Sequence, residues 1–298
     1  MSDFKQWSEE RARHFEVVAY DTLPPDNKLP WKLHEAMRYA VLDGGKRIRP
    51  LLVYASGLLV DANERALDRI ALAVEYIHSY SLVHDDMPCM DNDTLRRGKL
   101  TTHKKYGEAM AMLTGDALQA QAFFELTQTG LTSEQTVALV KLLSSAAGPA
   151  GMCGGQAVDL LAAHSDLTLS MLTTMHRMKT GAMIRASALM GLYAGQTMPE
   201  PALIGAIANY SACVGLAFQV IDDILDVTAE TEVLGKTAGK DAANEKPTFV
   251  SHLGLEKARE MAHSQIEIAL DSLASIGASK EKTVRLEEIA RYVLSRDH

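Results

Sequence analysis

The chain has 298 residues, of which 47% are apolar and 23% are charged, and its formal net charge is −8. This composition excludes a collagen-like or disordered chain, and the negative charge excludes a nucleic-acid binder that relies on overall positive charge. Three cysteines without a C-x-x-C pair argue against a disulfide framework and a cysteine-based zinc site. They suit a reducing compartment, so we expect the protein in the cytoplasm.

The amino-terminal segment mixes charges of both signs and lacks the apolar run of a signal peptide. Segments 150–198 and 250–298 contain no proline and are rich in helix-forming residues. Turn formers or polar residues interrupt the helical pattern at five places: 21–30, 88–98, 148–155, 198–201 and 228–247. None of these has linker composition, so we predict an all-α fold of about ten or more helices in a single domain, 1–298.

The first chemically distinctive segment is an apolar stretch that ends in aspartates. Apolar and functional positions of Leu67–Asp85 recur at spacings of three and four, which predicts a helix. No two-residue alternation competes with it, so no strand is predicted. Asp86 follows directly, but Pro88 disfavours helical continuation before Asp91. We therefore expect Asp91 to lie in a turn that folds back toward Asp85.

A second apolar stretch, 201–221, has no charged residue and the length of a membrane span. It contains polar side chains and runs straight into Asp222 and Asp223, so we predict a buried core helix and no membrane span. Asp222 and Asp226 lie four residues apart and share one helical face with Gln219.

Both acidic clusters follow strongly apolar flanks, where ionised carboxylates need partners. A solvated helix end explains one such cluster, but two clusters favour a hard divalent cation, and magnesium takes few carboxylates together with phosphate oxygens and water. Basic residues follow the first cluster (Arg96 and Arg97) and the second (Lys236, Lys240 and Lys246), and others lie nearer the start of the chain (Lys46, Arg47 and Arg49). Together with the acids they favour phosphate binding. A nucleotide P-loop is excluded, because Glu230 stands where the motif ending in Gly235-Lys236-Thr237 needs glycine.

The ordered motifs resemble those of short-chain trans-polyprenyl diphosphate synthases, and most of all the bacterial farnesyl diphosphate synthases. The resemblance covers about residues 31–246 and rests on these segments: Gly44 to Pro50, Asp85 to Gly98, Lys179 to Gly181, Phe218 to Asp226, and Gly235 to Lys246. It implies the isoprenoid synthase fold, with helices around a central catalytic cavity. It also implies a magnesium-dependent transferase, usually a homodimer, that condenses isopentenyl diphosphate with dimethylallyl and then geranyl diphosphate to give (E,E)-farnesyl diphosphate (C15).

The resemblance assigns roles residue by residue. Three magnesium ions are implied on Asp85, Asp91 and Asp222, supported by Asp86, Asp223 and Asp226. The implied allylic diphosphate shell is Arg96, Lys179, Thr180, Gln219, Lys236 and Lys246. The implied isopentenyl diphosphate site, which uses no metal, is Lys46, Arg49, His78 and Arg97. The implied catalytic set is Asp85, Asp86, Asp91, Arg96, Lys179, Asp222 and Lys236.

Product length is the finer expectation. By the resemblance, Tyr80 forms the floor that stops growth at fifteen carbons, about 7.5 Å along the helix from Asp85, and Ser81 belongs to the same region. Compared with the D-D-x-x-D form of the family's first motif, this chain has two extra residues between Asp86 and Asp91, which resembles the bacterial type of these synthases.

Other functions remain open at this point. A C20 (geranylgeranyl diphosphate) synthase is the first alternative, followed by a class I terpene cyclase and a non-catalytic helical subunit. Taken singly, His78, Gln219 and Lys179 are also typical of core packing or of an exposed helix face. Arg291 and Arg296 near the carboxyl terminus are further candidates for closing the isopentenyl site.

Overall fold

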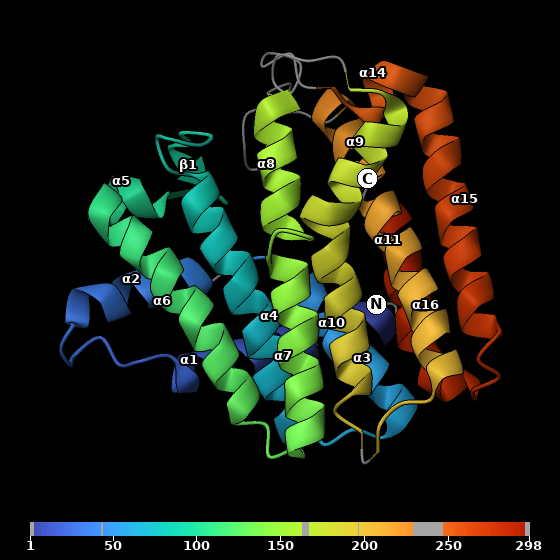
Figure 1. The fold of residues 1–298 in the computed structure, drawn as a ribbon, viewed down its shortest axis with the longest axis horizontal. Helices are drawn as coiled ribbons and strands as arrows, with labels where there is room; N and C mark the ends of the chain where they lie inside the picture. The colour runs from blue at the N-terminus through green and yellow to red at the C-terminus, as the bar shows by residue number, and fades with distance from the viewer. Residues whose placement is uncertain (1–2, 43, 163–166, 196, 229–246, 296–298) are drawn as a thin grey trace.

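The protein is helical over most of the chain (Figure 1). The computed structural model describes residues 3–42, 44–162, 167–195, 197–228 and 247–295. The first half contains α1 (Asp3–Thr22), α2 (Trp31–Val41), α3 (Ile48–Gly57), the 3-10 turn η1 (Leu58–Val60), α4 (Glu64–Asp85), β1 (Leu95–Arg96), β2 (Lys99–Leu100), α5 (Thr102–Tyr106), α6 (Glu108–Thr127) and α7 (Ser133–Ala147). The second half contains α8 (Met152–Ala162), α9 (Leu169–His176), the π-helical turn η2 (Arg177–Gly181), α10 (Ala182–Leu192), α11 (Pro201–Thr228), α14 (Phe249–Leu253), α15 (Leu255–Ala274) and α16 (Lys280–Ser295).

The prediction of an all-α fold is confirmed. The antiparallel pair β1–β2 was not predicted, and its two strands have only two residues each. A connection this short is set by turn geometry at Arg97 and Gly98, which both have positive φ, rather than by an alternating apolar pattern.

Helix α4 lies at the centre of the fold and packs against α3, α6, α2, α10 and α1. Its start is fixed by Asn63, whose side chain accepts a hydrogen bond from the Arg65 backbone N–H. Thirteen of its 22 residues are buried, because its apolar positions face neighbours on several sides. This placement carries the carboxyl end of α4, with its aspartates, to the upper end of the bundle in Figure 1.

The second acidic cluster ends another core helix. Helix α11 packs against α15 and α10, and 56% of its most apolar 18-residue window is buried, which is typical of a core helix. The continuous stretch Ser133–Ala162 also has the length and composition of a membrane span, and 33% of its window is buried. Length and apolar composition alone are weak evidence for a membrane span.

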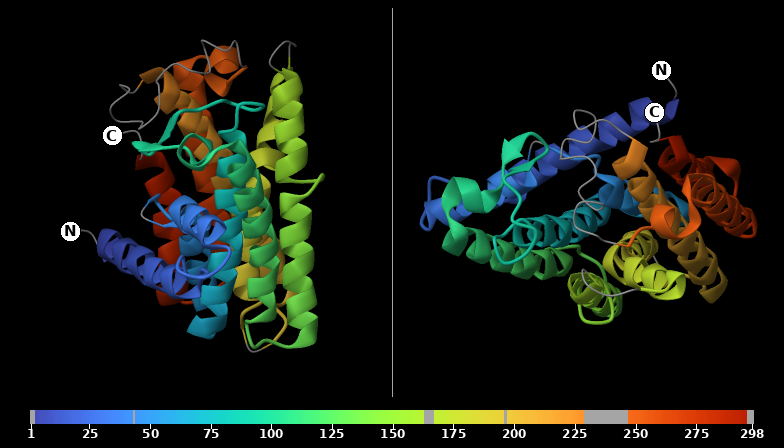
Figure 2. Two further views of the ribbon diagram at one scale, coloured as in Figure 1. Left: turned by 90° about the vertical axis from the view of Figure 1, so that its left-hand side faces the viewer. Right: turned by 90° about the horizontal axis from the view of Figure 1, so that it is seen from above.

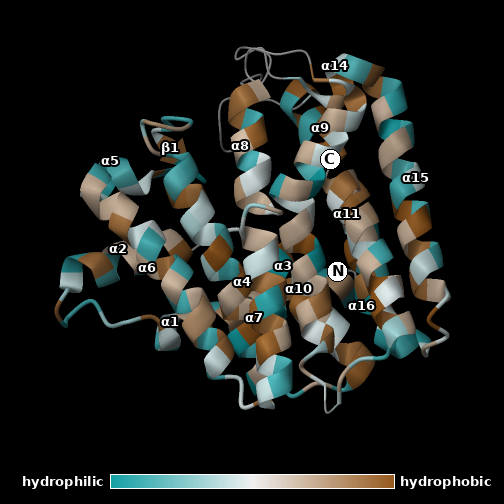
Figure 3. Ribbon diagram, in the orientation of Figure 1, coloured by the Kyte–Doolittle hydropathy of each residue, from teal (hydrophilic) through white to brown (hydrophobic). Residues whose placement is uncertain are grey.

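Helix α1 lies across one side of the bundle, at a steep angle to the other long helices (Figure 2). Phe15 and Ala19 are its fully buried residues, and they join the core around α4. Outer helices such as α15 alternate polar and apolar segments along their length, as amphipathic helices do (Figure 3). Glu16 of α1 pairs with Arg47, so α1 covers the loop that precedes α3.

Candidate active site

The first acidic cluster forms a tight turn at the end of α4. Beyond Asp85 the chain reverses, and the Asp91 backbone N–H donates to the Asp85 carbonyl oxygen at 2.8 Å. The Asn92 N–H donates to the Met87 carbonyl, and Asn92 takes positive φ, which asparagine tolerates well. The predicted fold-back of Asp91 toward Asp85 is therefore confirmed.

The donor chemistry of this turn suits a hard cation. Burial raises the pKa of Asp85 to about 6, the nearby Lys179 lowers it, and the negative charge of Asp91 raises it. Two carboxylates that repel each other gain from a shared cation, and magnesium prefers such oxygen ligands. Within the described residues no group of three or more His, Cys, Asp or Glu side chains forms a ready-made metal site.

The second cluster is built into α11. Asp223 accepts hydrogen bonds from the Gln219 side chain at 2.9 Å and from the Phe249 backbone N–H at 2.8 Å. It therefore joins α11 to the start of α14, a structural contact that supports the helix end. Asp226 is also buried, whereas Asp222 is partly exposed and its charge acts on Arg49.

The lysine and threonine of the third motif lie in the π-helical turn η2. The Lys179 Nζ atom lies 2.7 Å from the Asp159 carboxylate of α8, and the Thr180 hydroxyl donates to Gln219 at 3.2 Å. Gly155 of α8 allows this turn to approach, because a Cβ there would lie 2.3 Å from the Lys179 backbone nitrogen. Such π turns occur often at functional sites. The turn links α8 to α11 and places the charge of Lys179 near enough to Asp85 to lower the pKa of that carboxyl.

A cavity of about 480 Å³ runs from this turn along α4. Seven of the residues singled out in the sequence line it together: Arg49, His78, Tyr80, Ser81, Asp85, Lys179 and Thr180. The Tyr80 hydroxyl is hydrogen-bonded to the Cys153 sulfur at 3.4 Å, which joins α4 to α8 within the cavity wall. The Ser81 hydroxyl donates to the His78 carbonyl oxygen at 2.8 Å.

Charge around His78 favours anion binding. Burial, followed by the nearby Arg49 and Arg97, holds the pKa of His78 well below its usual value. A neutral imidazole can donate one hydrogen bond to a diphosphate oxygen without adding to the repulsion among the cations.

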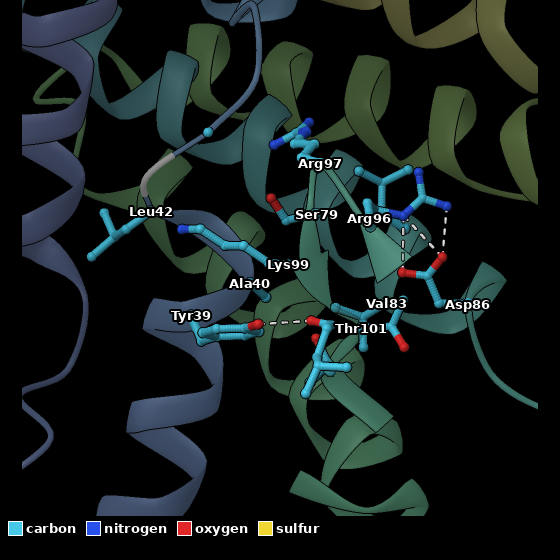
Figure 4. A pocket seen from close by; sticks show the side chains of 14 residues that line it. Tyr39, Ala40, Leu42, Ser79, Val83, Asp86, Arg96, Arg97, Lys99 and Thr101 are labelled. Carbon is cyan, nitrogen blue, oxygen red and sulfur yellow. Dashed lines mark hydrogen bonds and ion pairs between the residues drawn. The ribbon is translucent and has the colours of Figure 1, made fainter. Parts of the chain in front are cut away.

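The two arginines of the β1–β2 connection lie apart from this cavity. They line a small adjoining pocket together with Asp86 (Figure 4). Arg96 forms a bidentate ion pair with the Asp86 carboxylate, with contacts of 2.6 and 2.9 Å. The hairpin is attached to α2 by the Tyr39 hydroxyl, which donates to the Leu100 carbonyl oxygen at 2.7 Å.

Lys46 lines a different cavity, of about 750 Å³, between α1, the start of α3 and α16. Arg291, one of the two carboxyl-terminal candidates, lines the same cavity. The predicted residues Lys236, Lys246 and Arg296 lie outside the described residues.

Sequence reasoning missed Glu75, Glu16 and Asp159. Glu75 is 2% exposed, and its Oε1 atom lies 2.7 Å from an Arg47 nitrogen. An acid in the middle of an apolar helix, three residues before His78, was the available signal for Glu75. In the sequence, Arg47 is one of several cations expected to bind phosphate, but in the structure its side chain points into the protein.

Known proteins resemble this chain along most of its length. The chain is 45% identical to a probable farnesyl diphosphate synthase from Bradyrhizobium diazoefficiens, over 97% of this chain and 87% of the relative. It is 45% identical to the farnesyl diphosphate synthase of Escherichia coli, over 88% of this chain and 89% of the relative. A geranyltransferase from Helicobacter pylori, complexed with magnesium and isoprenyl diphosphate, superposes with a TM-score of 0.85 at 36% identity, covering 99% of this chain and 97% of that one.

The polyprenyl synthetase family model matches residues 30–287, a span that contains both acidic clusters and the cavity between α4 and α8. With this match and relatives of 45% identity along most of its length, the chain belongs to the polyprenyl synthetase family.

Proposed function

We propose that this protein is a farnesyl diphosphate synthase. It is a prenyltransferase that joins isopentenyl diphosphate to dimethylallyl diphosphate and then to geranyl diphosphate, giving (E,E)-farnesyl diphosphate. The observation that carries this function is the single cavity that has Asp85 and Lys179 at one end and His78 and Arg49 on its wall, and that includes Tyr80. Carboxylates, cations and an apolar channel are the three parts that an allylic diphosphate substrate needs.

Magnesium is the proposed cofactor, with three ions expected per site. Asp85, Asp91 and Asp222 would hold the ions, with Asp86, Asp223 and Asp226 in support. When bound, magnesium neutralises charge on the diphosphate leaving group. Two contacts within the protein support this division: Asp86 is paired with Arg96, and Asp223 accepts hydrogen bonds from Gln219 and Phe249.

The side chains of this protein stabilise the leaving diphosphate and hold the second substrate. Lys179, kept in place by Asp159, and Thr180 would bind the allylic diphosphate, together with Arg96, Gln219, Lys236 and Lys246. Cations placed where negative charge develops lower the barrier to C–O cleavage. The allylic carbocation is then attacked by the double bond of isopentenyl diphosphate, held nearby by Lys46, Arg49, His78 and Arg97.

Formation of the new C–C bond leaves a second carbocation, which loses a proton to complete the condensation. The departing diphosphate is the proposed acceptor of that proton. The apolar wall of the cavity matters here because water would trap the cation. Met87 and Met152 supply part of that wall and carry no nucleophile or base that would compete.

Product length is proposed to depend on Tyr80, with Ser81 beside it. Tyr80 is 5% exposed and its hydroxyl is hydrogen-bonded to Cys153, so its ring is a fixed obstacle rather than a mobile one. This favours the C15 product over the C20 alternative.

We also propose that residues 1–298 form one domain and that the protein is a cytoplasmic homodimer. In support of one domain, Trp7 and Leu142 each contact both of the large apolar cores. In support of a dimer, α6 exposes the apolar side chains Met112, Leu113 and Phe124.

The test is a condensation assay with labelled isopentenyl diphosphate and purified protein in magnesium. Dimethylallyl and geranyl diphosphates should be elongated, and farnesyl diphosphate should not. Asp222→Asn should reduce turnover at least about a hundredfold, because a proposed metal ligand is lost. Asp271→Asn, at an exposed aspartate on α15, is the matched control and should leave turnover unchanged. Equal turnover in both variants would contradict the proposed role of the second acidic cluster.

A further inference from the structure

The loop before α3 contains one arginine that faces away from the cavity. Arg47 has a left-handed backbone with φ of 50° and is 3% exposed. Its guanidinium contacts Glu75 of α4 at 2.7 Å and the Val41 carbonyl oxygen at 2.6 Å, and it pairs with Glu16 of α1 through two nitrogens. Three helices therefore converge on this one side chain.

The neighbours of Arg47 in sequence point elsewhere. Lys46 is exposed and lines the cavity beside α1 and α16, and Arg49 lines the cavity along α4. The Arg47 side chain points into the protein and its backbone conformation is unusual. Its contacts with Glu16, Glu75 and the Val41 carbonyl therefore fix the directions in which Lys46 and Arg49 point.

The carboxylate of Glu75 acts on more than Arg47. Its negative charge raises the pKa of both Arg49 and Arg97, whereas the charge of Arg97 lowers the pKa of Arg49, and the charges of Arg47 and Arg96 lower that of Arg97. Burial lowers the pKa of both as the largest effect. A 2% exposed carboxylate among three cations thus holds together groups that would otherwise repel one another.

Arg97 is also in contact with this loop. A Cβ placed on Gly45 would lie 2.7 Å from the Arg97 guanidinium, so the arginine side chain packs directly on the glycine backbone. The loop, the β1–β2 connection and α4 therefore form one connected unit around Glu75.

We propose that the buried Arg47–Glu75 ion pair is a positioning element for the isopentenyl diphosphate site, which sets the placement of Lys46, Arg49 and Arg97 without touching substrate itself. This inference rests on the proposed function, because it takes from it the assignment of those three cations to isopentenyl diphosphate.

Two explanations of Glu75 predict opposite results. If Glu75 only balanced charge, Glu75→Gln would make the site more positive and lower the KM for isopentenyl diphosphate. If Glu75 positions the cations, the same variant removes the ion pair that ties Arg47 to α4 and raises that KM about tenfold or more, while the KM for geranyl diphosphate changes less than about twofold. Arg47→Lys keeps the charge but loses the planar fork, so it should give the same pattern.

The matched control is a second ion pair that α4 forms with a buried carboxylate. Arg69 of α4 contacts Glu125 of α6 at 2.5 Å, and the Glu125 side chain is fully buried. Glu125→Gln removes a buried carboxylate that pairs with an arginine, as Glu75 does, but it lies on α6 and outside the cavity. It should lower the melting temperature and leave both KM values unchanged.

The experiment measures both KM values and the melting temperature for the wild type, Glu75→Gln, Arg47→Lys, Glu125→Gln and Arg49→Ala. A selective rise for isopentenyl diphosphate in Glu75→Gln supports the inference; if that variant does not fold, Arg47→Lys decides. An unchanged or lowered isopentenyl KM, or an equal rise for both substrates, overturns it. Arg49→Ala tests the proposed site separately, since an unchanged isopentenyl KM in this variant contradicts the assignment rather than the positioning role.

Discussion

Shortening Tyr80 should lengthen the product by one isoprene unit. Tyr80 lies five residues before Asp85 on α4, so its ring stands about 7.5 Å along the helix axis from the acidic cluster. The next aromatic side chain on the same face is Tyr76, which lies one helical turn further and is fully buried. In Tyr80→Ala, Tyr76 would become the new end of the channel.

The expected extension follows from helix geometry. Four residues of α-helix rise about 6 Å, and the four backbone bonds of one isoprene unit extend by about 5 Å. One further unit therefore fits before Tyr76 is reached, and a second does not. We expect Tyr80→Ala to make mainly the C20 product and the Tyr80→Ala/Tyr76→Ala double variant to go beyond C20.

The Tyr80→Ala substitution should also lower the free energy of unfolding. Replacing a buried aromatic residue by alanine costs roughly 3–5 kcal/mol, and we expect the lower end because Tyr80 borders an existing cavity. Tyr80→Phe is the matched control: it keeps the ring, loses the hydroxyl contact with Cys153, and should still stop at C15.

The assay is mass spectrometry of products at complete consumption of isopentenyl diphosphate, on protein checked by circular dichroism. A folded Tyr80→Ala enzyme that still stops at C15 would refute the floor, and one that passes C20 directly would refute the role given to Tyr76.

Three further predictions follow from the site and the core. Gly45→Ala should raise the KM for isopentenyl diphosphate about tenfold in steady-state kinetics, because a Cβ displaces Arg97 and φ of 93° disfavours alanine; an unchanged KM would contradict the close packing. Lys179→Met should lower kcat about 10²- to 10³-fold in the same assay with a folded enzyme, because a cation beside the leaving group is lost; a change confined to KM would contradict this role. Burial lowers the pKa of His176 to about 4, from about 6.5 in the unfolded chain. Below pH 6.5 the unfolded chain therefore binds a proton that the folded protein does not, so the stability present above pH 6.5 is lost as the pH falls toward 4. Urea unfolding at pH 7 and pH 5 should show the wild type losing about 2 kcal/mol more than His176→Gln, and equal losses would contradict that burial.

Patterns of local sequence predicted much of this structure. The spacing of apolar residues in Leu67–Asp85 predicted α4 with its carboxyl end in place, and the uncharged stretch 201–221 predicted the core helix α11. Pro88 predicted the turn that returns Asp91 to Asp85, because proline constrains its own and the preceding residue.

Features that depend on contacts between distant segments were not predictable in this way. The π turn at Lys179 depends on the close approach of Gly155, and nothing in the propensity of 177–181 indicates it. In the sequence, Arg47 lies among cations that were expected to bind phosphate, but its partners Glu16 and Glu75 are 31 and 28 residues away. Only the packing of α1 and α4 shows that the Arg47 charge pairs with buried or partly buried carboxylates within the protein.

The most direct test of the proposed function is the product of the wild-type protein. Purified protein would be incubated with magnesium, isopentenyl diphosphate and dimethylallyl diphosphate, with a chelator-treated sample as control, and the products sized by mass spectrometry. We predict a C15 product that disappears when the metal is removed. A main product of C20 would contradict the assignment of product length, and the absence of any condensation in magnesium would contradict the assignment of prenyltransferase activity itself.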